Sequence, residues 1–287
     1  MAVSGAIAGA ERTDPPTVLI RPSRGWPAPD LGELRGHHEL LYFLVWRTLK
    51  VRYKQTALGA GWAVAQPFLT MIVFSVFFGR LARIPSNGDP YPVFAYTALV
   101  PWTFFATALA GASNSLVEHE RMLTKVYFPR LLLPLAAVCA SLVDFAIAFV
   151  VLLGLLAWYG IAPGAQALTL PLLVALAFCT ALAVGLWLAA VNVQYRDVRH
   201  VTPFLVQLWL FVSPVAYPTS LVPERWRALY GLNPMAGVVD GFRWALLDRG
   251  EPPPATVMAA SAVAVALLLV GGLFYFRRME RTFADVV

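Results

Sequence analysis

Residues 115–134 read SLVEHERMLTKVYFPRLLLP, and the organisation of the whole chain depends on this stretch. Five of its side chains are charged, and His119 can become so. Apolar runs that are each long enough to cross a bilayer lie directly before and after it. A short charged element therefore connects two membrane helices, and the remaining sequence has to indicate what that element contacts.

The composition of the chain is that of an integral membrane protein. Of its 287 residues, 59% are hydrophobic and only 13% are charged, too few charges to cover a soluble globule of this size. A membrane helix needs about 20 apolar residues, because each residue advances about 1.5 Å through about 30 Å of hydrocarbon. The predicted fold is an all-α membrane protein with six transmembrane helices, at residues 59–81, 93–115, 131–159, 168–195, 201–218 and 255–276.

Shorter segments complete the predicted organisation. Residues 1–36 are rich in proline, lack the pattern of a signal peptide and form a cytoplasmic N-terminal tail. An N-terminal amphipathic interface helix follows at residues 37–55, within a transmembrane domain that extends over residues 37–276. Between spans five and six, two short amphipathic pieces around Trp226 and Trp244 are predicted to be re-entrant half-helices. Residues 277–287 form a cytoplasmic C-terminal tail.

The distribution of basic residues predicts the orientation. Sixteen Lys and Arg residues fall in the two tails, the amphipathic helix, the charged stretch and the turn at residues 196–200, whereas six fall on the other side. Because basic residues are concentrated in cytoplasmic loops, both termini are predicted to be cytoplasmic, with the protein in the cell inner membrane. Their placement beside apolar runs also argues against nucleic acid as a partner.

The sequence lacks the common motifs of enzymes and metal sites. The three lysines are Lys50, Lys54 and Lys125, and none follows a glycine, so no Walker A loop is present. The cysteines Cys139 and Cys179 lie in apolar runs, which favours small buried side chains over a disulfide. The four histidines do not have the spacing of a metal site. We therefore expect no catalytic residue, no bound cofactor and no metal in this chain.

Asp144 is the one acidic residue deep in a predicted span. Intramembrane carboxylates are costly and often functional, but a hydrogen bond between helices also explains one. Because no basic group lies inside the spans to relay a proton, the structural interpretation is favoured here.

Two sets of side chains are candidates for contact with a transported molecule. The interface helix carries basic residues that anchor it to an anionic leaflet and could also bind a phosphate or pyrophosphate headgroup at the interface. Aromatic rings in the spans pack against lipid or other helices, and a minority could line a conduit in which sugar rings stack on them. The headgroup candidates are Arg47, Lys50, Arg52, Tyr53 and Lys54, and the channel-lining candidates are Phe68, Tyr96, Trp102, Phe104, Trp209, Phe211 and Tyr217.

Four segments together resemble a known family. They are RTLKVRYKQTALGAGWAVAQP (47–67), ERMLTKVYFPRLLLP (120–134), NVQYRDVRHVTPFLVQLWLFVSPVAYP (192–218) and LNPMAGVVDGFRWALL (232–247). Their combination is similar to the membrane subunit, or permease, of type-2 ABC exporters, and within them to the branch that exports lipid-linked polysaccharide such as O-antigen. The resemblance covers nearly the whole chain from about residue 37.

The resemblance implies a homodimer of permease subunits paired with two separate ATP-binding cassette subunits, which bind ATP and Mg²⁺. In that family the cytoplasmic loop after span two is a coupling helix that docks on the ATPase. Carried over to this sequence, the ATPase-coupling residues are Glu118, His119, Glu120, Arg121, Met122, Lys125, Tyr127 and Arg130, with Arg196, Asp197 and Arg199 in the neighbouring turn.

The expected function is therefore export of lipid-linked, O-antigen-like polysaccharide across the inner membrane, driven by a partner ATPase. Alternatives within the class are an exporter of teichoic acid, capsule or galactan, or an ABC-2 exporter of drugs or lipids. A polytopic glycosyltransferase is a weaker alternative, because no two carboxylates are arranged for acid and base catalysis.

Overall fold

The computed structural model describes residues 32, 36–54, 59, 61–223, 226, 230–247, 252–280 and 283, and these form helices and connecting turns without a strand. Five helical segments among them are long and apolar enough to cross a membrane. The all-α membrane fold is thus confirmed. The five are α3 (Gly61–Phe74) continued by the π-helix η1 (Ser75–Leu81), α4 (Tyr91–Glu118), α6 (Leu132–Trp158), α7 (Leu170–Gln194) preceded by the 3₁₀-helix η2 (Ala165–Thr169), and α11 (Ala255–Met279).

The predicted fifth span is shorter than expected. Helix α8 (Val198–Val212) has 15 residues, which at 1.5 Å per residue cover about 22 Å of the roughly 30 Å hydrocarbon layer. It ends two residues before Pro214, where Ser213 is already extended with a ψ of 150°. The residue before a proline disfavours helical geometry, which explains the early end. The count of six complete spans therefore stays a prediction.

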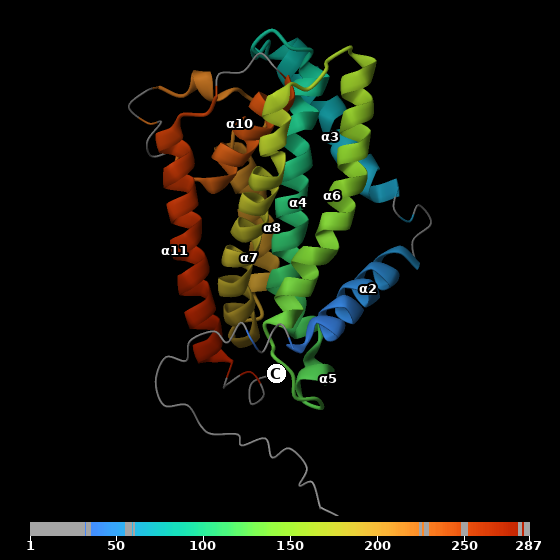
Figure 1. Ribbon diagram of the computed structural model, residues 1–287, viewed down its shortest axis with the longest axis vertical. Helices are drawn as coiled ribbons and strands as arrows, with labels where there is room; N and C mark the ends of the chain where they lie inside the picture. The colour runs from blue at the N-terminus through green and yellow to red at the C-terminus, as the bar shows by residue number, and fades with distance from the viewer. Residues whose placement is uncertain are drawn as a thin grey trace, which may run out of the picture.

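Helix α4 is the centre of the bundle (Figure 1). In its most apolar stretch 78% of the residues are buried, and it packs against α3, α6, α7 and α8 as well as α10 (Pro234–Leu247). Small residues bring α7 close to it: a Cβ on Gly185 would lie 2.7 Å from that of Ala112, too near for the helices to keep their separation. A displacement of α4 would therefore reach most of the bundle.

The two ends of the bundle differ. At the lower end in Figure 1 lie the short helix α5 (Glu120–Leu123), the start of α2 (His38–Lys54) and the end of α11, joined by an apolar cluster that includes Leu44, Leu123 and Phe276. Helix α10 lies toward the opposite end, almost wholly buried. Its predicted re-entrant character stays a prediction.

Some predicted segments lie outside the described residues. They are most of the N-terminal tail, residues 281, 282 and 284–287 of the C-terminal tail, and most of the piece around Trp226. Within the described part, α11 continues to Met279, three residues beyond the predicted end of the transmembrane domain at residue 276.

Candidate functional site

The predicted coupling element is an almost direct continuation of the central helix. Helix α4 ends at Glu118, the chain bends at His119, and α5 begins at Glu120. The His119 ring holds the bend, because its Nδ1 lies 2.9 Å from the Ser115 carbonyl oxygen. A force applied to α5 therefore acts on α4 through a single residue.

This element exposes one face and buries another. Leu123 and Phe128 are buried in the apolar cluster at the lower end. Tyr127 is 83% exposed and Val126 is 58% exposed beside it. An exposed apolar pair among charges is typical of a contact surface. The charged members of the exposed face are Glu118, Glu120, Arg121 and Lys125, and Met122 is half-buried.

Arg130 has an internal role that the sequence did not indicate. Its backbone N–H donates to Glu280 Oε1 at 3.2 Å, and its guanidinium donates to the Glu280 carbonyl oxygen. The guanidinium also lies 5.9 Å from the centre of the Phe283 ring. The end of α11 thus fixes the C-terminal side of the coupling element.

The predicted neighbouring turn is tied to the same end of α4 by buried polar groups. The Asn192 amide donates to the Ser113 carbonyl oxygen at 2.9 Å and to Asn114 Oδ1 at 3.1 Å. One turn into α8, Thr202 Oγ1 lies 3.3 Å from Ser113 Oγ. A polar residue inside an apolar run was the available signal for Asn192. Arg196, Asp197 and Arg199 are exposed on the turn itself.

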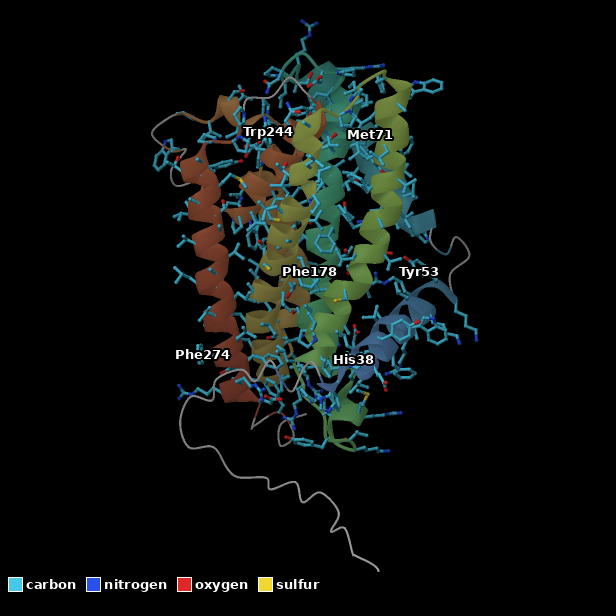
Figure 2. All side chains as sticks on the ribbon, in the orientation of Figure 1. His38, Tyr53, Met71, Phe178, Trp244 and Phe274 are labelled. Atoms are coloured by element: carbon cyan, nitrogen blue, oxygen red, sulfur yellow. The ribbon has the colours of Figure 1, made fainter. Side chains whose placement is uncertain are left out.

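The interface helix α2 runs obliquely along the bundle, from the lower end toward the middle of its height (Figure 1). In Figure 2, His38 lies near the lower end of the bundle and Tyr53 near the middle of its height. Leu44 is buried and Leu41, Val45 and Leu49 are half-buried, whereas Arg47, Lys50 and Lys54 are exposed, so the predicted apolar side of the helix faces the bundle. The exposed side also carries the rings of Tyr42, Phe43 and Trp46. It does not lie flat, because its C-terminal end docks on α6 well above the charged end.

Asp144 of α6 is in contact with the C-terminal end of α2. It lies twelve residues into α6, about 18 Å along the helix at 1.5 Å per residue. Arg52 forms an ion pair with one carboxylate oxygen, and the Tyr53 hydroxyl donates to the other. Burial and the hydrogen bond to Asp144 raise the pKa of Tyr53 to about 12, so the phenol keeps its proton. The intramembrane carboxylate therefore joins α6 to α2.

Two adjoining cavities open around this ion pair. One of about 420 Å³ lies among α2, α3, α4 and α6, and one of about 430 Å³ lies among α2, α4 and α6. Arg52 and Glu118 line both. Of the predicted headgroup residues, Arg47, Arg52 and Tyr53 line these cavities, whereas Lys50 and Lys54 are exposed and line neither, Lys50 lying 4.4 Å from the Trp46 ring centre.

The structure separates the predicted channel-lining rings by burial. Tyr96, Trp102 and Phe104 lie in the protein core, although Phe104 also lines the 420 Å³ cavity. Trp209 is half-buried, with its Nε1–H donating to Asn233 Oδ1 at 2.8 Å. The remaining rings keep open faces in this subunit: Phe68 and Phe211 are exposed, and Tyr217 is half-buried.

A buried arginine at the far end was missed by sequence reasoning, which counted it among the loop residues. Arg243 of α10 donates to the carbonyl oxygens of Pro214, Val215 and Tyr217 at 2.5, 2.8 and 3.2 Å. Its guanidinium lies 3.6 Å from the centre of the Phe94 ring. The residue thereby satisfies the non-helical backbone that follows α8, which hydrocarbon could not do.

The described residues contain no group of three or more His, Cys, Asp or Glu side chains that could hold a metal ion.

Comparisons with known proteins identify the family of this chain. The sequence profile described as ABC-2 type transporter matches residues 39–247. The chain is 33% identical over 257 residues to the O-antigen export system permease protein RfbA of Myxococcus xanthus, covering 89% of this chain and 98% of that protein. It is 25% identical to a protein of the same name from Klebsiella pneumoniae, over 87% of this chain and 95% of that protein. A third relative, the Polysialic acid transport protein KpsM of Escherichia coli, is 22% identical over 82% of this chain and 91% of that protein.

Proposed function

The chain belongs to the ABC-2 type transporter family, and from this membership we propose that it is the permease subunit of an exporter of lipid-linked, O-antigen-like polysaccharide. The family consists of transport subunits that work with separate ATP-binding cassette subunits, which bind ATP and Mg²⁺. The names of three relatives support polysaccharide as the cargo. Because one of them is named for polysialic acid, a different polysaccharide is the second candidate.

The observation that carries the proposal is the attachment of the exposed coupling element to the most buried span. Helix α5 and the exposed residues Val126 and Tyr127 offer a surface for the ATPase, and α4 connects that surface with the long helices α3, α6 and α7 and with the shorter helices α8 and α10. Binding and hydrolysis of ATP on the partner would thus change the packing of the whole bundle. The turn at residues 196–200 adds a second contact, tied to α4 through Asn192.

The orientation follows from the charges at the two ends. The basic residues of the coupling element, the turn after α7 and the last turn of α11 gather at the end that carries α5, where α2 also begins. We therefore place this end, and with it both termini, on the cytoplasmic side of the inner membrane.

Two apolar faces are suited to a homodimer around a polysaccharide path. The open faces of α3 and α8 carry aromatic rings, including Trp62, Phe68, Phe204 and Phe211, whereas the open face of α11 is aliphatic. Helix α8 is too short to cross the hydrocarbon layer alone, so lipid is a poor match for its open aromatic face. These faces are therefore proposed to meet the second copy and the cargo, with α11 facing lipid.

Cysteine cross-linking measures this arrangement. In a background with Cys139→Ser and Cys179→Ser, Leu208→Cys on the open face of α8 is expected to form a disulfide-linked dimer in membranes. Val263→Cys, on the open face of α11, is the matched control and should remain monomeric. Cross-linking through α11 in place of α8 would show that the proposed interface is on the wrong face.

The cargo is tested in cells and in vesicles. Loss of the chain is expected to remove the polysaccharide from the cell surface and to leave lipid-linked polymer on the cytoplasmic leaflet. In proteoliposomes with the partner ATPase, a lipid-linked glycan should stimulate ATP hydrolysis, whereas small amphiphiles should not. Stimulation by small amphiphiles alone would favour a drug or lipid exporter, and sugar-donor turnover by the isolated chain would indicate a glycosyltransferase.

A further inference from the structure

The ion pair between Arg52 and Asp144 borders a cavity at the docked end of α2. Asp144 is near the midpoint of α6, and charged side chains at that depth are costly unless paired. The side chain of Arg52 is 33% exposed and that of Asp144 is 16% exposed, so the pair lies at a wall and not inside the core. The 420 Å³ cavity is bordered by both residues.

Among the described residues that line the two cavities, the positive and negative charges cancel. The ionised residues that line them are Arg47 and Arg52 on one helix and Glu118 and Asp144 on two others. His119 also lines the 430 Å³ cavity, and its Nδ1 lies 2.9 Å from the Ser115 carbonyl oxygen. An anion that enters therefore meets no net positive charge, and it reaches the guanidinium of Arg52 only by displacing a carboxylate.

We propose that Asp144 competes with headgroups for the guanidinium of Arg52. A lipid diphosphate displaces Asp144 from this guanidinium, whereas the phosphodiester of an ordinary phospholipid does not. The choice of a lipid diphosphate rests on the proposed function, since a glycan carried on a lipid diphosphate is the expected cargo. The competing carboxylate carries one negative charge, the same as a phosphodiester, whereas a diphosphate carries at least two and more acceptor oxygens for a forked guanidinium.

The neighbouring tyrosine makes this exchange feasible. Tyr53 donates to the carboxylate oxygen that Arg52 does not contact, so Asp144 keeps one hydrogen bond when the guanidinium turns away. Both donors are adjacent residues at the end of α2. Release of Arg52 from Asp144 therefore weakens the contact of α2 with α6, and re-formation of the ion pair restores it. Asp144 would thus allow only headgroups with more than one negative charge to bind Arg52. The binding of such a headgroup would change the contact between α2 and α6.

Equilibrium binding to the purified full-length chain tests the inference with three probes. Farnesyl diphosphate supplies a lipid diphosphate, lysophosphatidylglycerol a phosphodiester, and inorganic pyrophosphate a diphosphate without lipid. Wild type is expected to bind farnesyl diphosphate at least tenfold more tightly than lysophosphatidylglycerol. In Asp144→Asn, the affinity for lysophosphatidylglycerol should rise about tenfold and the preference should largely disappear.

Three further variants give the controls. Arg52→Gln/Asp144→Asn leaves no unpaired charge and should lose at least tenfold in affinity for farnesyl diphosphate. Asp144→Glu keeps the charge and should keep the preference. Glu39→Gln removes an exposed carboxylate from the same helix, outside both cavities, and should bind as wild type. Thermal unfolding of each variant reports whether it is folded.

An unchanged preference in folded Asp144→Asn would overturn the competitor role. Undiminished diphosphate binding by the double variant would overturn Arg52 as the ligand, even if Asp144→Asn did not fold. Pyrophosphate binding as tight as that of farnesyl diphosphate would show a site for free phosphate and overturn the lipid headgroup. A chain that shows the predicted binding but exports no polysaccharide would contradict only the proposed function.

Discussion

Arg243→Met is expected to leave little folded protein. The side chain is 7% exposed, and its guanidinium bonds three carbonyl oxygens of the segment after α8. It also lies 3.9 Å from a carboxylate oxygen of Asp240, which would remain in the interior without a countercharge. Removing one partner of a buried ion pair typically lowers the free energy of unfolding by about 3–5 kcal/mol. That is a large fraction of the stability of most domains.

The measurements are the yield of monodisperse protein in detergent and the midpoint of thermal unfolding. Arg243→Lys should lose part of the stability, because one ammonium group cannot bond three carbonyls as a planar guanidinium does. Arg243→Met/Asp240→Asn should recover part of it, since no carboxylate is then left without a countercharge. Arg80→Met, which removes an exposed arginine from η1, is the matched control and should unfold as wild type. A wild-type midpoint for Arg243→Met would show that the carbonyls find other donors.

The spans were predictable because hydropathy is a local property. Each of the five long helices lies within a few residues of an apolar run, and the coupling element lies where charges interrupt two of them. The early end of the fifth span was visible in Pro214, whereas Pro203 lies inside α8. What the prolines could not indicate is which group bonds the chain beyond α8, because Arg243 lies 29 residues after Pro214.

The contacts of the charged residues were not predictable, since they join distant parts of the chain. Arg52 and Asp144 are 92 residues apart, and Arg130 and Glu280 are 150 apart. In the sequence, a basic residue beside an apolar run looks the same whether its side chain contacts lipid or a distant carboxylate. The aromatic rings of α4 posed a related difficulty. The helix is apolar on all sides, so no periodicity separated buried rings such as Tyr96 from rings that face a path.

Reversing two charges on the coupling element is expected to abolish transport while the protein still folds. Arg121 and Lys125 are exposed, on and just beyond α5, and Arg121→Glu/Lys125→Glu leaves the buried anchors Leu123 and Phe128 in place. Like charges brought together across an interface cost several kcal/mol, and each 1.4 kcal/mol weakens binding about tenfold. The ATPase should therefore bind at least a hundredfold more weakly, and export should fall to background.

Three readouts separate loss of docking from loss of structure. Thermal unfolding of the reversed variant should match wild type, its recovery of the ATPase on co-purification should fall sharply, and surface polysaccharide should disappear. Arg121→Lys/Lys125→Arg keeps both charges and should retain all three properties. Because His119 alone separates α5 from α4, a variant that still binds the ATPase but exports nothing would place the fault in that connection. Normal export by the reversed variant would mean that force reaches α4 elsewhere, with the turn at residues 196–200 as the remaining exposed contact tied to it.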